Sequence, residues 1–426
     1  MNQIKQGYKQ TKVGIIPENW EVVNFDELKD KTDRHSITGG PFGSDLKSEH
    51  YTSSGVRVIQ LQNIGDGKYI NKEFVYTSEE KANQLKNCLI YPNEIILAKM
   101  AEPVARACLI PSFEDKFLMC SDGIRLLVDK NKFSTKYVLE YINYDLFRKI
   151  AINRSTGSTR GRIGLTDLKT IPLALPPLKE QEKIAEILTI WDEAITKQTE
   201  LLRAKELQKK GLMQKLLSGE VRFSGFSDEW EEVRLSKIIK LQGGYAFKSE
   251  EFKKKGIPII RISNISNNSN YMEMDDLVYY GELPNESNFL IKKNDLLIAM
   301  SGATTGKVSI YNLEKKAYLN QRVGLFKVIK PTLINYSFLI QFVFSNFFSV
   351  QLKSLLVAGA QPNISSKDIK SLKIKLPSLP EQRKIAEVLS LADDEINLLK
   401  NELEELKQQK KALMQKLLTG QVRVKV

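Results

Sequence analysis

An internal repeat at a fixed offset of 201 residues constrains the fold of this 426-residue chain more than any other feature. Residues 180–188 (EQEKIAEIL) and 381–389 (EQRKIAEVL) share seven of nine positions. Residues 212–222 (LMQKLLSGEVR) match 413–423 (LMQKLLTGQVR) at the same offset, with no residue gained or lost in between. One inserted residue would rotate the rest of a helix by about 100°. The unbroken offset therefore predicts a long continuous helix in each copy.

Heptad spacing supports these two helices. Positions that alternate steps of three and four are apolar at seven of ten sites in the first copy and nine of ten in the second. Each helix should span about 40 residues, or ~60 Å. Antiparallel pairing is expected for a duplicated chain, although the pattern also allows parallel pairing or two unrelated amphipathic helices on separate cores. The predicted pairing residues are Ile184, Leu188, Trp191, Ile195 and Leu202 in the first helix, and Ile385, Leu389, Ile396, Leu399 and Leu403 in the second.

The segments before each helix repeat more faintly and contain short apolar runs that predict strands. Residues 55–64 (GVRVIQLQNI) match 256–265 (GIPIIRISNI), and 93–98 match 294–299. The predicted fold class is mixed α/β (α+β): two repeated domains joined by two long helices in an antiparallel coiled coil. The predicted parts are an N-terminal arm (1–16), a first domain (17–170), a first helix (171–219), a second domain (220–370) and a second helix (371–426).

Motifs for catalysis or cofactor binding are not found in the sequence. The Pro176-Pro177 pair lacks the flanking polar and aromatic residues that a DNA amino-methyltransferase needs. Residues 302–307 (GATTGK) have three residues between the glycines instead of four, which favours a turn between strands with Lys307 exposed. Two histidines and three cysteines form no triad or zinc pattern. We therefore expect no cofactor or metal in this chain.

Net charge and loop composition point to a polyanionic partner. The 64 Lys and Arg exceed the 51 Asp and Glu by 13, which favours nucleic acid. Polar positions differ between the repeats over a shared apolar pattern, although surface drift and solvated linkers are the alternative explanation. The candidate DNA-binding residues are Lys47, Arg57, Gln60, Gln62, Asn63, Arg154, Ser158, Thr159, Arg160, Arg162, Lys248, Arg261, Ser263, Asn264, Lys307, Gln321, Arg322, Gln361 and Asn363.

The cellular location is predicted from the absence of targeting signals in the sequence. The longest apolar stretch, residues 337–348, is interrupted by polar residues and is shorter than the ~20 residues of a membrane span. The first 14 residues have no apolar core or cleavage site of a secretory signal. We expect a cytoplasmic chain without a membrane partner.

Taken together, these motifs resemble the specificity subunits of type I restriction-modification systems. The resemblance covers nearly the whole chain: two Trp-Glu segments (16–28 and 228–235), the Gly-Gly turns, residues 297–308 (LIAMSGATTGKV), 319–324 (LNQRVG) and both helix motifs. The first copy departs from the family pattern at 100–107 (MAEPVARA) and 120–125 (CSDGIR).

The resemblance implies a non-catalytic, sequence-specific DNA-binding subunit. Each domain would recognise one part of a bipartite, asymmetric site, and the helices would set the spacing and dock two methyltransferase subunits. Those partners and the restriction subunits would carry S-adenosylmethionine, ATP and magnesium. A methyltransferase-only or fused system, or a coiled-coil scaffold unrelated to DNA, is the alternative.

Overall fold

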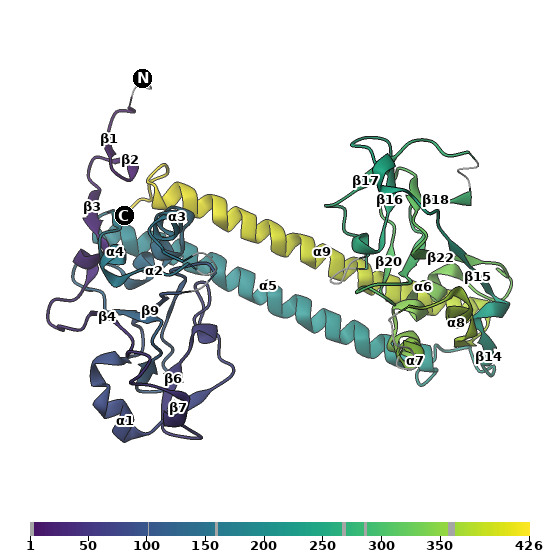
Figure 1. Ribbon diagram of the computed structural model, residues 1–426, viewed down its shortest axis with the longest axis horizontal. Coiled ribbons are helices and arrows are strands. Elements are labelled where there is room, and N and C mark those ends of the chain that lie inside the picture. Colours follow the sequence, from purple (N-terminus) through teal and green to yellow (C-terminus); the bar gives the residue numbers. More distant parts are fainter. Residues whose placement is uncertain (1–3, 101, 158–160, 266–269, 285–287, 357–362) are drawn as a thin grey trace. The chain divides into compact units, whose positions relative to one another are not determined.

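The computed structural model describes residues 4–100, 102–157, 161–265, 270–284, 288–356 and 363–426. The chain divides into two compact units (Figure 1). Unit 1 comprises Met1–Gln198 and Glu402–Val426, and unit 2 comprises Thr199–Asn401. Each unit thus contains one domain and part of both long helices, so packing divides the chain differently from the five predicted parts. Those five boundaries stay a prediction.

Unit 1 is built on two sheets. One has the strand order β10-β9-β12-β4, and the other has the order β5-β7-β6-β11-β8, in which β6 and β11 run parallel. Two small antiparallel pairs, β1-β2 and β13-β3, complete the unit. Its strands are β1 (Tyr8–Thr11), β2 (Gly14–Pro17), β3 (Glu21–Asn24), β4 (Ile37–Gly39), β5 (Tyr51–Thr52), β6 (Val56–Ile59), β7 (Val75–Thr77), β8 (Leu89–Ile90), β9 (Ile95–Ala98), β10 (Ala107–Leu109), β11 (Phe117–Met119), β12 (Gly123–Leu126) and β13 (Pro172–Leu175). Its short helices are η1 (Phe25–Leu28), η2 (Ser48–His50), η3 (Leu61–Asn63), η4 (Lys86–Cys88), α1 (Glu79–Gln84), α2 (Thr135–Asn143), α3 (Asp145–Asn153) and α4 (Leu165–Lys169).

Unit 2 repeats this plan. Its sheets have the orders β15-β22-β19-β20 and β17-β16-β21-β18, with β16 and β21 parallel, and a separate β14-β23 pair. The mixed α/β fold class is therefore confirmed. The strands are β14 (Glu231–Arg234), β15 (Ile239–Gly243), β16 (Ile257–Ile260), β17 (Val278–Tyr280), β18 (Leu290–Ile291), β19 (Leu296–Ala299), β20 (Val308–Ile310), β21 (Ala317–Leu319), β22 (Val323–Val328) and β23 (Lys373–Leu376). The short helices are η5 (Leu235–Lys237), η6 (Ser249–Glu251), η7 (Ile262–Asn264), α6 (Tyr336–Phe344), α7 (Asn346–Leu356) and α8 (Ser366–Ser371).

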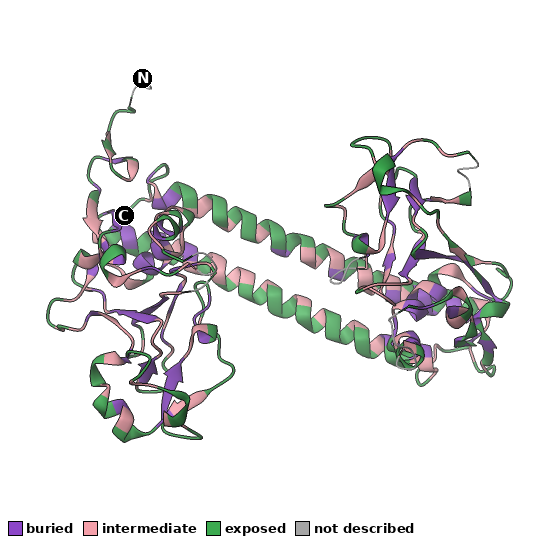
Figure 2. Cartoon of the chain, viewed as in Figure 1, coloured by how far each residue is buried: buried purple, intermediate pink, exposed green. Residues whose placement is uncertain are grey.

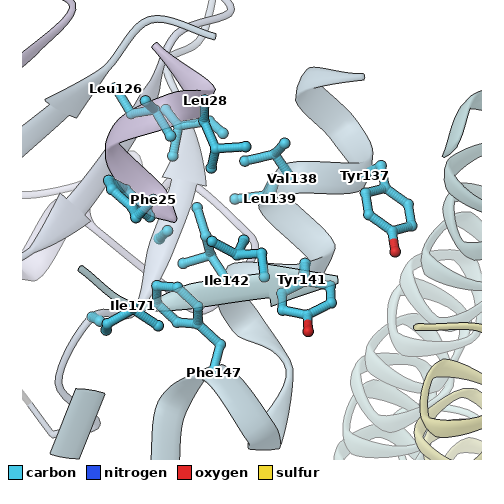
Figure 3. Packing of buried hydrophobic residues seen from close by; sticks show 14 of the residues in the cluster. Phe25, Leu28, Leu126, Tyr137, Val138, Leu139, Tyr141, Ile142, Phe147 and Ile171 are labelled. Carbon is cyan, nitrogen blue, oxygen red and sulfur yellow. The ribbon is translucent and has the colours of Figure 1, made fainter. Parts of the chain in front are cut away.

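The core of unit 1 joins the sheet, the short helices and the long helices (Figure 3). Phe25 of η1 packs on Phe147 of α3, with ring centroids 5.9 Å apart. Leu188 and Leu417, from the two long helices, are buried in the same cluster. Figure 2 shows buried residues concentrated in the strands, whereas the middle of each long helix is largely exposed or half-buried. Each domain is therefore fixed to helix ends rather than to helix centres.

The long helices are α5 (Leu178–Ser218) and α9 (Leu379–Leu418). Ion pairs within each unit give their direction: Lys410 Nζ lies 2.7 Å from the Asp192 carboxylate in unit 1, and Lys209 pairs with Asp393 in unit 2. In both pairs, a late residue of one helix contacts an early residue of the other. The antiparallel prediction is thereby confirmed within each unit.

The predicted pairing residues, which form the seam between the two long helices, divide into two groups. Ile184, Leu188, Ile385 and Leu389 are buried, but they pack in the domain cores as well as between the helices, which the heptad pattern did not predict. Ile396 and Leu403 are also buried, and Trp191, Ile195, Leu202 and Leu399 are half-buried. Lysines 209 and 410 occupy seam positions, where charged groups form ion pairs across the helices.

The repeated Glu-Gln pair at the start of each long helix anchors that helix to its domain. Gln181 accepts a hydrogen bond from the Ser134 backbone amide at 2.9 Å, and Gln382 does the same for Asn335 at 2.8 Å. Arg423 donates to the buried Glu180 at 2.6 and 2.7 Å. Arg222 donates to Glu381 at 2.9 and 2.7 Å in the same way. Because a buried carboxylate needs a partner, these repeated motifs are structural.

Among the described helices, none is long and apolar enough to cross a membrane by itself. Helices α6 and α7 together meet that requirement by length and composition, but they are bent by 59°. Phe338, Phe342 and Phe348 of this pair lie buried in the core of unit 2.

Candidate nucleic-acid interface

Several strands of unit 1 end side by side and form what we call its strand-end edge (residues 40, 60–63, 99–100, 120–122 and 162–163). The Cys120 backbone amide donates to the Ile59 carbonyl at 2.9 Å, and the Lys99 backbone amide donates to the Asp122 backbone carbonyl at 2.7 Å. The Ile163 amide donates to the Lys99 carbonyl at 3.0 Å. Loops that lie far apart in the sequence are thus brought together at one edge.

Unit 2 has an equivalent strand-end edge (residues 244–245, 261–264, 300–301, 320–322 and 363–364). Backbone hydrogen bonds connect its segments. The Asn320 N–H donates to the Ile260 carbonyl at 3.0 Å, the Met300 N–H to the Arg322 carbonyl at 2.9 Å, and the Ile364 N–H to the Met300 carbonyl at 2.8 Å. The Gly-Gly turns close both edges. A Cβ atom would lie 1.8 Å from the Cys120 carbonyl oxygen at Gly40 and 2.0 Å from that of Leu319 at Gly244, so only glycine fits at either place.

A short turn follows the central strand of each unit, where the sequence had predicted a longer strand. Strand β6 ends at Ile59 because the Asn63 side chain accepts a hydrogen bond from the Gln60 amide at 2.9 Å and closes a 3₁₀ turn. Gln60 and Gln62 therefore lie on this turn, so the strand predicted within residues 55–64 ends earlier than its apolar pattern suggested. In unit 2, Asn264 closes the same turn through the Arg261 amide at 3.0 Å.

A different side chain holds this turn in each unit. Arg106 donates to the carbonyl oxygens of Leu61 and Ile64 at 2.9 and 2.6 Å in unit 1. Thr304, inside the 302–307 segment, donates to the Ile262 carbonyl at 3.1 Å in unit 2. That segment connects antiparallel strands β19 and β20, as predicted. Lys307 is half-buried rather than exposed, and it lines a cavity of about 470 Å³ beside α9.

Three candidate residues are buried. Arg57 is only 5% exposed; its guanidinium lies 3.8 Å from the centre of the Phe74 ring and donates to Asn71 at 2.7 Å. Asn63 and Asn264 are 1% and 2% exposed, and besides closing their own turns they donate to the carbonyl oxygens of Ile70 and Glu273. All three help to hold the edge in place, and their contact with DNA stays a prediction.

The other candidates stay predictions. Most lie at an edge or on a loop next to it, whereas Arg154 is tied by hydrogen bonds to Asp167 and Thr170, and Lys307 faces α9. Lys47, Gln62, Arg162, Lys248, Ser263, Gln321, Arg322 and Asn363 are exposed, and Gln60, Arg154, Arg261 and Lys307 are half-buried. Ser158, Thr159, Arg160 and Gln361 lie outside the described residues.

The charges at the two edges differ at equivalent positions. Arg162 forms an ion pair with Asp122 at 2.8 Å in unit 1. The matching positions in unit 2 are Asn363 and Arg322, since both pairs occupy the same places in the backbone hydrogen-bond network. Unit 1 thus carries a paired arginine and aspartate at the two positions where unit 2 carries an asparagine and an exposed arginine.

Sequence reasoning missed Phe42, whose side chain is 83% exposed on the loop after Gly40. Burial raises the pKa of the Cys120 thiol to about 11 and that of Cys108 to about 12, so both thiols are protonated at neutral pH. Within the described residues, no group of three or more His, Cys, Asp or Glu is placed to hold a metal ion. The edges are therefore suited to binding through hydrogen bonds and charge.

Comparison with known proteins agrees with the repeat. The family model described as "Type I restriction modification DNA specificity domain" matches residues 17–204 and again 227–408. This chain belongs to that family. The specificity-subunit family is the one that the sequence motifs resembled, so that prediction is confirmed.

Relatives match over nearly the full length of the chain. The type I restriction enzyme MjaVIII specificity subunit of Methanocaldococcus jannaschii is 31% identical over 99% of this chain and 97% of its own. The MjaX specificity subunit, described as putative, of the same organism is 28% identical over 99% and 98%. A crystal structure of a type I restriction-modification S subunit from M. genitalium has the same fold, with a TM-score of 0.59 and 20% identity, over 94% of this chain and 96% of that one.

Proposed function

We propose that this chain is the non-catalytic DNA-binding specificity subunit of a type I restriction-modification complex. Each strand-end edge recognises one part of a bipartite, asymmetric site in double-stranded DNA. The observation that carries this proposal is the repetition of one rigid edge with different polar groups. The turns closed by Asn63 and Asn264 are the same, whereas Gln60 and Gln62 are replaced by Arg261 and Ser263.

The chemistry of this edge suits DNA. Arginine donors match guanine and phosphate, and amide side chains match adenine. The net charge of +13 supplies attraction to phosphate over a longer range. A coiled-coil scaffold unrelated to DNA would explain α5 and α9 but would give no reason for two polar edges that differ.

The long helices supply the second part of the proposal, which is the docking of two methyltransferase subunits. Ile190 of α5 and Leu391 of α9 occupy equivalent positions in the repeat and are 59% and 62% exposed. Apolar side chains this exposed, at two equivalent sites, fit two copies of one partner. Methyltransferase and restriction subunits would bring S-adenosylmethionine, ATP and magnesium, and this chain would bring recognition.

A salt series tests the DNA-binding part. Binding of the purified chain, with and without the methyltransferase subunit of its host, is measured on random duplex DNA between 50 and 200 mM salt. A DNA-binding subunit gives a steep linear fall of log K with log salt, whereas a scaffold gives no binding. Cleavage of unmodified DNA after addition of a host restriction subunit would separate a full system from a methyltransferase-only one.

Modification mapping tests the bipartite site. Replacing residues 17–170 with the equivalent domain of a relative should change one part of the methylated site and leave the other unchanged. Joint change of both parts would contradict separate recognition by the two units.

The role of the helices in spacing is tested by deleting one heptad from each, residues 195–201 and 396–402, which keeps antiparallel partners in register. Seven residues correspond to ~10 Å of helix, or about three base pairs at 3.4 Å each. Methylation of a library of spacers should then shift to shorter spacers or disappear, because three base pairs also rotate one part of the site by ~100°. Full activity on the original spacing would show that the helices do not set it.

A further inference from the structure

Gln60 and Gln62 hydrogen-bond to each other on the turn at the strand-end edge of unit 1. The Gln62 side-chain amide donates to the Gln60 side-chain oxygen at 2.7 Å. Gln62 is exposed and Gln60 is half-buried, so the pair lies at the surface of the edge. Two flexible side chains are thereby linked to each other.

The backbone beneath this pair is held rigidly. The Asn63 side chain donates to the carbonyl oxygens of Ile70 and Lys72 at 3.1 and 2.7 Å while it accepts from the Gln60 amide. Arg106 binds the other side of the turn. Both glutamines therefore start from fixed positions, which lowers the entropy lost when they bind a ligand.

The mutual hydrogen bond determines what the pair presents outward. It uses one N–H of the Gln62 amide and one lone pair of the Gln60 oxygen, so the whole Gln60 NH₂ group and the whole Gln62 carbonyl oxygen remain for a ligand. Reversing the direction of the bond leaves the same outward set. In the major groove adenine presents the N7 acceptor next to the N6 donor, whereas guanine presents two acceptors, and cytosine and thymine each present a single polar group.

We propose that Gln60 and Gln62 act together as an adenine-recognising pair in the part of the site bound by unit 1. This inference rests on the proposed function. Unit 2 offers the contrast, because the equivalent Arg261 guanidinium supplies donors only, one of them already bonded to the Asp276 carbonyl at 2.9 Å, and Ser263 adds a single hydroxyl that can donate or accept. The two units thus require different bases opposite the same turn.

The test exchanges the pair for its counterpart. The double variant Gln60→Arg/Gln62→Ser has the unit 2 residues on the unit 1 turn, and Gln84→Arg, at an exposed glutamine on α1, is the matched charge control. The full chain with its methyltransferase partner selects sites from a randomised duplex library. The native chain and the control should prefer adenine at one position of the unit 1 part by about tenfold or more. The double variant should lose that preference at this position alone.

A base analogue tests which adenine atoms the pair recognises. Replacing that adenine with 7-deazaadenine removes the N7 acceptor, so binding should weaken for the native chain and stay unchanged for the double variant. Gln62→Leu, which alters only an exposed side chain, gives the same test if the double variant folds poorly. Unchanged adenine preference in the variants would overturn the inference while the proposed function stands. Failure of the native chain to select any sequence would instead overturn the proposed function.

Discussion

The two units have the same backbone plan but differ in the polar groups buried beneath it. In unit 1, Arg125 of β12 pairs with Glu94 at 2.6 Å, and both side chains are less than 8% exposed. The sheet register places Leu325 of unit 2 at the Arg125 position, and Asp295 takes the place of Glu94. Divergence therefore extends below the surface, which shows that the repeat preserves backbone geometry more strongly than any particular set of charges.

A second difference lies where the long helices meet the domains. Lys410 binds Asp192 at 2.7 Å and Glu140 at 3.3 Å in unit 1. In unit 2, Gln341 takes the place of Glu140 and donates to Asp393 at 3.0 Å. One junction thus holds two carboxylates around a lysine, and the other holds one carboxylate between Lys209 and an uncharged amide.

Replacing Arg125 with leucine, its unit 2 counterpart, should have the largest effect of the changes considered, and that effect is on the free energy of unfolding. Arg125→Leu leaves the buried Glu94 carboxylate without its charged partner, although the Tyr91 backbone amide still donates to it, and should lower the free energy of unfolding of unit 1 by about 3–5 kcal/mol. Adding Glu94→Gln should restore much of that loss, because no buried charge remains. Denaturant unfolding of the three proteins measures this, and a loss below 1 kcal/mol for Arg125→Leu would show that the ion pair is not needed.

Removing the asparagine that closes each turn should have the next largest effect. Asn63→Ala leaves buried backbone groups without partners and should cost about 1–3 kcal/mol. It should also abolish selection in the unit 1 part of the site, while Asn264→Ala should affect the unit 2 part. Library selection with each variant distinguishes the two, and equal damage to both parts by either variant would contradict independent edges.

The junctions should differ in their response to pH. Burial raises the pKa of Glu140, and the nearby Asp192 adds to this, against the opposing effect of Lys410. A carboxyl group whose pKa is higher in the folded state lowers stability as pH rises from its unfolded value near 4.5. Glu140→Gln should therefore stabilise the chain at pH 7 relative to pH 4, and Gln341→Glu should introduce the opposite trend in unit 2. Unfolding free energies at several pH values measure this, and identical pH profiles would refute it.

Removing a single positive charge at a strand-end edge should have the smallest effect, and that effect is on the salt dependence of DNA binding. Arg322→Ala removes an exposed cation and should reduce the salt slope of DNA binding by about one. Arg162→Ala should reduce it less, because Asp122 already neutralises much of that charge. Binding constants across a salt series compare them, with Lys237→Ala as a control at an exposed lysine on η5. A larger change for Arg162 would reverse the proposed order.

Sequence reasoning succeeded where the structural cause is local or repeated. The constant offset and heptads predicted α5 and α9, because an inserted residue would have rotated one helix face away from its partner. The antiparallel direction followed from the duplication and was confirmed by the ion pairs of Lys209 and Lys410.

The burial of polar residues could not be predicted in the same way. Arg57 lies beneath aromatic rings contributed by Phe74 and Phe113, which are distant in the sequence. Asn63 follows an apolar run that continues the strand pattern, so its capping hydrogen bond to Gln60 was not expected from alternation alone. Both outcomes depend on contacts that form only after the sheets have assembled.

The anchoring of each domain on both long helices has a consequence for genetic recombination. Leu188 and Leu417 both pack in the core of unit 1, although more than 200 residues separate them in the sequence. A crossover at the start of α5 would therefore import new sheets onto helix ends inherited from the recipient. Viable hybrids should preserve the residues that share this core, such as Tyr137 and Ile171, whereas the exposed polar side chains at the strand-end edge are free to vary.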